Sequence, residues 1–187
     1  MTQFEVLEQV HVDLVSMKKS VSEQFFYETP EELNYKPAPE SWSALQCVEH
    51  LNLVNGYYIS EFNTSISKPA KGSSNEPYKP GLIGAYMIKG IKPDQGKIKN
   101  KMKTFKTLKP LVEREQGAIV KPEVVFADFF ADLKSMVQIA EALKERNGQK
   151  IKVKSLLGSI FRFRGIDALR FLLNHNERHL LQASHAI

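Results

Sequence analysis

Four segments of about 20 residues each carry apolar side chains at alternating spacings of three and four, the repeat of one helix face. They cover residues 3 to 27, 43 to 66, 122 to 147 and 165 to 184. Because an amphipathic helix must bury its apolar face against another element, four such helices favour an all-α fold with a four-helix bundle as the default. We expect a single domain over residues 1–187, an up-down bundle with long connections between its second and third and its third and fourth helices.

The second segment begins with a helix-start signal. Ser43 followed by Gln46 is a capping box, in which each side chain accepts a hydrogen bond from the other residue's backbone N–H. Trp42 before the cap and Cys47 after it fit the hydrophobic staple that sets how a chain enters a helix. The inward face of this helix is expected to carry Cys47, His50, Val54, Tyr57 and Glu61, with Leu51, Leu53 and Tyr58 broadening it.

The connection over residues 67–121 is long and basic, with twelve lysines against four acidic residues. Connections of this length inside a small domain are often functional or act as lids. Residues 81–88 within it could form a short helix with an apolar face. Its glycines do not form a phosphate-binding loop, because no strand precedes them and no Gly-Lys-Ser/Thr sequence follows.

The second connection covers residues 149–165. Lysines alternate with aliphatic residues at its start, as in a strand, but no partner strand is evident, so we expect an extended loop. Cations in the two connections could attract an anionic cofactor or substrate, although such charges are more often surface residues. These cations are Lys97, Lys99, Lys101, Lys103, Arg162 and Arg164.

The composition excludes several classes of protein. A formal net charge of +5 is mild for a dedicated nucleic-acid binder, and no aromatic-basic platform or helix-turn-helix signature accompanies it. Cys47 is the single cysteine, so a disulfide framework and a multi-cysteine metal site are both excluded. No signal-peptide pattern or membrane-spanning apolar segment is evident. We expect a cytoplasmic protein with no nucleic-acid or membrane partner.

The histidines are the candidate functional residues. His175 and His179 stand four residues apart in the last predicted helix, so both rings lie on one helix face. His50 lies seven residues after the start of the second helix, and antiparallel packing would bring it level with the pair. Three convergent imidazoles with an open fourth position resemble a catalytic zinc centre. We therefore predict a divalent-metal site, with zinc or nickel favoured and manganese or iron as alternatives.

A purely structural interpretation of these histidines stays open. A buried imidazole can be satisfied by hydrogen bonds to amide or carboxylate side chains. Such side chains are available at Gln46, Glu61, Asn174 and Gln182. The metal is favoured because three of the five histidines in the chain fall on inward helix faces.

Two motifs resemble a known family. Pro39-x-x-Trp42-Ser43-x-x-Gln46-x-x-x-His50-Leu51 and Leu169-x-Phe171-Leu172-x-x-His175-Asn176-Glu177-Arg178-His179-x-x-Gln182 are similar to motifs of the DinB-like superfamily, which includes YfiT-type metalloenzymes. The resemblance implies a four-helix bundle, commonly dimeric. It also implies a divalent metal held by one histidine of the second helix and two of the last, here His50, His175 and His179. The family often has glutamate where this chain has Gln46.

The resemblance implies chemistry less specifically than it implies a metal. Some relatives are transferases or isomerases that use a low-molecular-weight thiol such as bacillithiol or mycothiol, and others are regarded as hydrolases. We expect a metal-dependent enzyme, hydrolase or thiol transferase, that activates water or a thiol against a small-molecule substrate. Tyr57 and Glu61 are candidate pocket residues, and no general base is assigned. The alternative is a non-catalytic metal-binding or stress-related protein.

Overall fold

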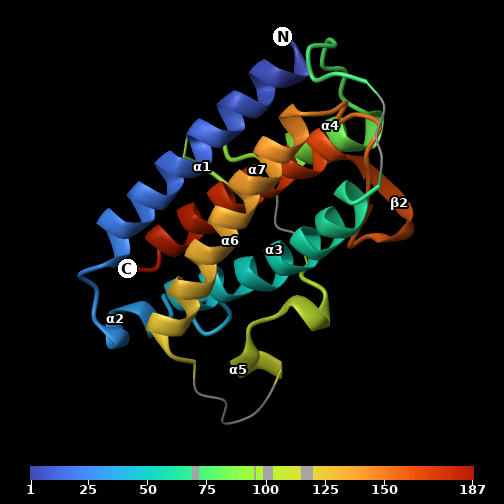
Figure 1. The fold of residues 1–187 in the computed structure, drawn as a ribbon. Helices are drawn as coiled ribbons and strands as arrows, with labels where there is room; N and C mark the ends of the chain where they lie inside the picture. The colour runs from blue at the N-terminus through green and yellow to red at the C-terminus, as the bar shows by residue number, and fades with distance from the viewer. Residues whose placement is uncertain (69–71, 95, 99–102, 115–119) are drawn as a thin grey trace.

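The computed structural model describes residues 1–68, 72–94, 96–98, 103–114 and 120–187, and these are mostly helical (Figure 1). Its four long helices match the four predicted segments to within three residues at each end. They are α1 (Gln3–Phe25), α3 (Ala44–Ile66), α6 (Pro122–Lys144) and α7 (Gly165–Ser184). The predicted capping box is confirmed, since Ser43 and Gln46 exchange hydrogen bonds at the start of α3.

The long helices pack as a closed group in which α1 and α3 each contact both α6 and α7. The rings of Phe25 and Phe126 lie 5.7 Å apart, which places the end of α1 beside the start of α6. Asn52 near the start of α3 donates to the carbonyl of Val125, also near the start of α6, at 2.8 Å. Thus α3 and α6 run in the same direction, and α1 and α7 run in the opposite one (Figure 1).

The up-down alternation expected of the bundle is therefore wrong from the third helix on, because α6 runs parallel to α3 and α7 runs parallel to α1. The chain leaves α3 at one end of the molecule and enters α6 at the other, so residues 67–121 must return along its length. Sequence periodicity identifies helices but not their directions, because direction depends on how the connections pack.

The long connection is anchored to the helices. Its residues 74 and 76 accept backbone hydrogen bonds from the start of α1, and the predicted short helix is present as α4 (Leu82–Ile91), which packs on α7. Asp167 is fully buried on α7 and accepts hydrogen bonds from the hydroxyl of Tyr78 at 2.5 Å and the backbone N–H of Gly81 at 2.8 Å. Burial raises the pKa of the Tyr78 hydroxyl to about 12, so it remains a donor at neutral pH. Asp167 thus fixes the start of α4.

Residues 149–165 were expected to form an extended loop, and that expectation is wrong. They contain the antiparallel strands β1 (Lys152–Ser155) and β2 (Gly158–Arg164), which pair with each other. The turn between them places Gly158 at φ 125°, a left-handed conformation that favours glycine. The partner strand was thus inside the same connection. Phe163 of β2 stacks on Phe171 of α7 with ring centroids 5.5 Å apart, so the hairpin joins the core.

Three smaller helices complete the described elements. They are α2 (Pro30–Asn34), the 3-10 helix η1 (Lys106–Leu108) and α5 (Leu111–Arg114). No helix among the described residues is long and apolar enough to cross a membrane.

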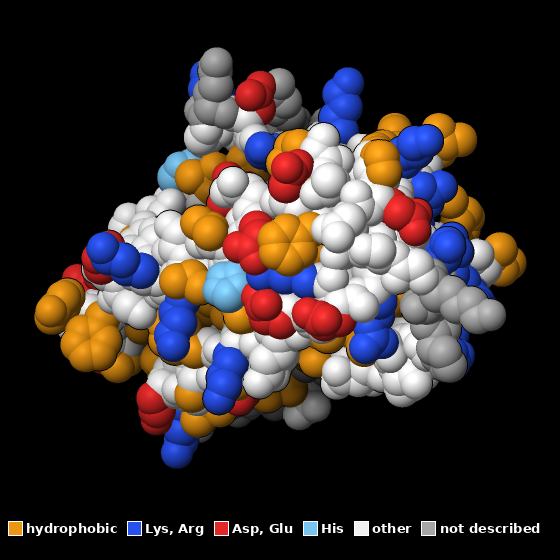
Figure 2. All heavy atoms as spheres, turned by 45° about the horizontal axis from the view of Figure 1, so that its top comes forward, with side chains coloured by type: hydrophobic (Ala, Val, Ile, Leu, Met, Phe, Trp, Pro, Cys, Tyr) orange, Lys and Arg blue, Asp and Glu red, His pale blue; other side chains and the backbone are white. Residues whose placement is uncertain are grey.

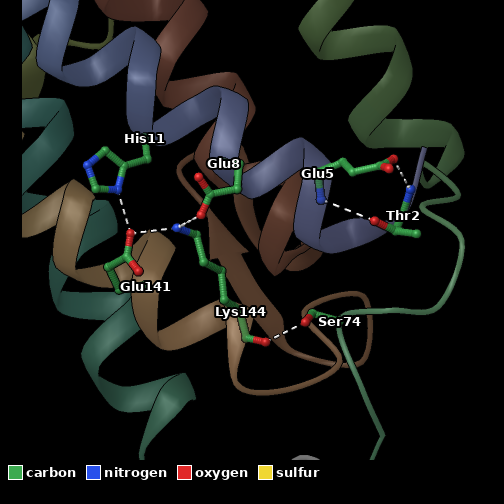
Figure 3. A network of polar contacts seen from close by, with 7 residues as sticks. All are labelled: Thr2, Glu5, Glu8, His11, Ser74, Glu141 and Lys144. Atoms are coloured by element: carbon green, nitrogen blue, oxygen red, sulfur yellow. Dashed lines mark hydrogen bonds and ion pairs between the residues drawn. The ribbon is translucent and has the colours of Figure 1, made fainter.

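A polar network joins α1, α6 and the long connection near the N-terminus (Figure 3). Lys144 contacts Glu8 and lies 2.7 Å from Glu141, which in turn lies 2.5 Å from the ring nitrogen of His11. Ser74 donates to the backbone carbonyl of Lys144. On the face drawn in Figure 2, basic and acidic side chains are interspersed, so the net positive charge is not gathered into one patch there.

The contact between α4 and α7 predicts the effect of a methyl group on α4. A Cβ atom at Gly84 would lie only 2.5 Å from the buried carboxylate of Asp167. We expect Gly84→Ala to lower the free energy of unfolding by about 1–3 kcal/mol, measured by urea denaturation. Gly90 is the matched control in the same helix, because its added Cβ would meet nothing within 4 Å. Gly90→Ala should be neutral or stabilise by about 0.5–1 kcal/mol, and equal effects of the two changes would contradict the assigned packing.

Candidate metal centre

The antiparallel packing of α3 against α7 brings three imidazoles together. The ring centroid of His50 lies 5.2 Å from that of His175 and 4.7 Å from that of His179, and the latter two lie 4.6 Å apart. Each ring offers one nitrogen, and these nitrogens lie within 4.8 Å of one another. Three nitrogen donors at this separation could hold one metal ion.

Hydrogen bonds orient two of the rings. Nδ1–H of His50 donates to the backbone carbonyl of Leu108 at 2.7 Å, and Nδ1–H of His179 donates to Oε1 of Gln182 at 3.1 Å. A ring nitrogen that carries a proton cannot bind a metal. These bonds therefore leave Nε2 as the nitrogen of each ring whose electron pair is free to bind a metal. The same arrangement of an outer acceptor and an inner metal ligand is usual for metal-binding histidines.

The hydrogen bonding of the His175 ring bears on whether a metal fits the site. Its Nδ1 is buried without a hydrogen-bond partner among the described residues. An unsatisfied buried polar atom costs roughly 1–3 kcal/mol, so it indicates a missing ligand or solvent molecule. With three nitrogen donors within reach of one point, the site fits a divalent metal ion.

Burial also sets the protonation of the rings. It lowers the pKa of His175 well below its usual value, with a further contribution from His179, and it lowers the pKa of His179 to about 3. It lowers the pKa of His50 as well, although the bond to Leu108 opposes this. All three rings are therefore neutral at neutral pH, which is the form that binds metals.

Trp42 and the part of the long connection around η1 and α5 lie against one side of the site. The indole of Trp42 lies 5.0 Å from the ring of His50 and 6.0 Å from that of His179. Its Nε1–H donates to Glu113 of α5 at 2.5 Å, and Glu49 accepts the backbone N–H of Leu111 at 2.7 Å. Together with the carbonyl of Leu108, these bonds hold η1 and α5 against the start of α3.

A cavity of about 510 Å³ opens beside the three rings, within the usual size range of ligand sites. Its described walls come from α3, α4, α7, the hairpin turn, residues 40–42, Ile98, residues 103–105 and Leu108. Apart from the histidines it is lined by Glu40, Ser41, Trp42, Val54, Tyr58, Met87, Ile91, Ile98, Lys103, Thr104, Phe105, Leu108, Leu156, Leu157, Phe171, Arg178 and Gln182. The long connection is therefore a wall of the cavity.

A comparison with protein families identifies the family of the chain. The family profile of the DinB superfamily matches residues 23–183, which include all three histidines. The chain belongs to the DinB superfamily. No curated protein matches the chain, and no solved structure does.

Two pocket residues predicted for this DinB-superfamily chain lie elsewhere. Tyr57 and Glu61 do not line the cavity, whereas Val54 and Tyr58 do. After Val54 the buried face of α3 continues through Tyr58, which the prediction placed at the margin of the face, and not through Tyr57. Glu61 instead lies 3.7 Å from Lys154. Spacings of three and four both fit a helix, so the pattern alone could not distinguish these positions.

The predicted cations are mostly outside the cavity. Lys103 lines it, but Arg162 is exposed elsewhere and Arg164 donates to the carbonyl of Lys79 at 2.5 Å. Lys97 is exposed and is not among the lining residues. Lys99 and Lys101 lie outside the described residues.

The sequence interpretation missed the main cation of the DinB-superfamily site. Arg178 is 5% exposed and lines the cavity. It follows His175 by three positions in α7, a spacing that places two residues on neighbouring parts of one helix face. That spacing could have identified it from the sequence.

The lowered histidine pKa values predict a pH dependence for the metal-free protein. Below about pH 6.5 the unfolded chain takes up protons on these histidines, whereas the folded state, with the pKa of His179 at about 3, does not. The free energy of unfolding therefore decreases as the pH is lowered, by up to about 2 kcal/mol for one such histidine between pH 7.5 and pH 5. We expect His179→Gln to lose roughly 1–2 kcal/mol less than the unmodified chain, measured by urea unfolding after EDTA treatment. Equal losses in both proteins would contradict the neutral, buried ring.

Proposed function

We propose that this protein is a metal-dependent enzyme that holds a divalent cation on His50, His175 and His179 and acts on a small molecule in the adjoining cavity. The observation that carries the proposal is the convergence of three neutral imidazoles beside a cavity large enough for a ligand. A cation bound there would supply Lewis acidity and lower the pKa of a water or thiol ligand, so that a nucleophile forms at neutral pH. Hydrolysis and thiol transfer are the two reaction classes proposed.

The chain's own residues have distinct parts in this proposal. The carbonyl of Leu108 and the amide of Gln182 orient His50 and His179, so that their free nitrogens are held before any metal arrives. Trp42 covers two of the rings and limits access of water from that side. Preorganised ligands of this kind lower the entropy cost of binding.

A thiol cofactor remains part of the proposal through the cations of the cavity wall. Arg178 and Lys103 line the cavity and would attract an anionic thiol cofactor. No residue is assigned as general base.

Metal binding is the first test. After removal of metal and reconstitution with zinc, nickel or manganese, we expect about one metal per chain by elemental analysis. His50→Ala, His175→Ala and His179→Ala should each weaken affinity by roughly 100-fold or more, because each removes a ligand. His185→Ala is the matched control, since His185 is exposed and outside the cavity. Absence of bound metal in the unmodified protein would overturn the proposal.

The single tryptophan gives a second readout of the same site. Trp42 lies beside two of the proposed ligands, so binding of a paramagnetic ion such as Co²⁺ should quench its fluorescence, and Zn²⁺ should reverse the quenching by competition. Once binding is established, a screen of ester, amide and thiol-electrophile substrates with zinc-loaded and nickel-loaded protein tests turnover. Metal binding without any turnover would favour the non-catalytic alternative.

A further inference from the structure

The cavity has chemically different ends along α7. Phe171 lies at one end, with its ring centroid 5.9 Å from that of Tyr58 on α3. The backbone N–H of Leu156 lies 3.4 Å from the hydroxyl of Tyr58, which brings the hairpin turn to the same place. Val54 lies one turn before Tyr58 and completes an apolar wall.

The other end is polar. Arg178 lies seven positions after Phe171 on α7, a rise of roughly 10 Å along the helix. Arg178 lines the same cavity as His175 and His179, three positions after the first and one before the second on α7. Gln182 and Ser41 also line the cavity.

The charge of the cavity wall favours an anion. Among the described residues, the lining contains two cations, the buried Arg178 and the exposed Lys103, against one carboxylate, the exposed Glu40. A guanidinium carries five N–H donors, so Arg178 can keep a contact within the protein and still hold a carboxylate. A buried cation also attracts an anion more strongly than an exposed one, because less water screens the pair.

We propose that the cavity binds a small amphipathic anion, with an apolar chain or ring between Val54, Tyr58 and Phe171 and a carboxylate beside Arg178. His175 lies between Phe171 and Arg178 on α7, and His179 directly follows Arg178. Placing the reacting bond beside these rings rests on the proposed metal function. The binding preference itself does not. Ligands of this class include medium-chain carboxylic acids and aryl carboxylates.

Octanoate is a suitable probe, because its extended length is comparable to the span from Phe171 to Arg178. Isothermal titration calorimetry with the full chain, both metal-free and zinc-loaded, would compare octanoate with 1-octanol, butyrate and octyltrimethylammonium. We expect one octanoate per chain, affinity about tenfold or more above that of 1-octanol, and no binding of the cation. Affinity should rise up to about fourfold per methylene from butyrate to octanoate, as each methylene leaves water. Equal affinities for octanoate and 1-octanol would overturn the proposal.

Two variants locate the two ends. Arg178→Met keeps similar volume and should remove the preference for octanoate over 1-octanol while leaving 1-octanol binding within about twofold. Arg162→Met is the matched control, because Arg162 is an exposed arginine outside the cavity. Val54→Phe should weaken octanoate but not butyrate, since it fills the apolar end. If Arg162→Met lowers the preference as much as Arg178→Met does, the assigned anion site is wrong.

The test stays decisive if Arg178→Met does not fold, as judged by circular dichroism. Two further variants then test the polar end. Arg178→Lys keeps the charge and should retain most of the octanoate preference, and Lys103→Met should lose only a smaller part of it. Elemental analysis of the same samples separates this inference from the proposed function. Metal binding without a carboxylate preference overturns only the inference, and a carboxylate preference without metal binding overturns only the metal function.

Discussion

The packing of α3 against α7 depends on one buried pair of amides. The side chains of Asn55 and Asn176 are fully buried and exchange two hydrogen bonds, at 3.0 and 3.2 Å. Each amide would be left unsatisfied in a non-polar core if the helices slipped by one turn, so the pair favours one register over its neighbours. That register places His50 opposite His175 and His179. The site therefore depends on an interaction that touches none of its three histidines directly.

The long connection contributes to the site rather than only joining two helices. Because α3 and α6 run in the same direction, the connection between them returns along the molecule. Its described residues Lys103, Thr104, Phe105 and Leu108 line the cavity beside the three histidines. Asp167 fixes the start of α4, and Leu108 accepts the hydrogen bond that orients His50. Substitutions in segments that line a site in this way can change which ligand is bound without altering the helices, as is common for functional loops on a rigid scaffold.

Different parts of the site were predictable to different degrees. Ser43 and Gln46 identify the start of α3 because a capping box acts within one helical turn. The one-residue difference between Tyr57 and Tyr58 was not predictable, because the buried face of a helix depends on which neighbour covers it. The hairpin was missed because its two strands stabilise each other, and neither is identified alone.

The sequence by itself determined the four long helices and the three histidines that belong together. Apolar spacing and capping act over a few residues, and a spacing of four places two rings on one face whatever surrounds them. Only the tertiary structure decided the direction of α6 and the path of the long connection. These features arise from contacts between residues far apart in the chain, and the free energy of each contact depends on the packing of all its neighbours.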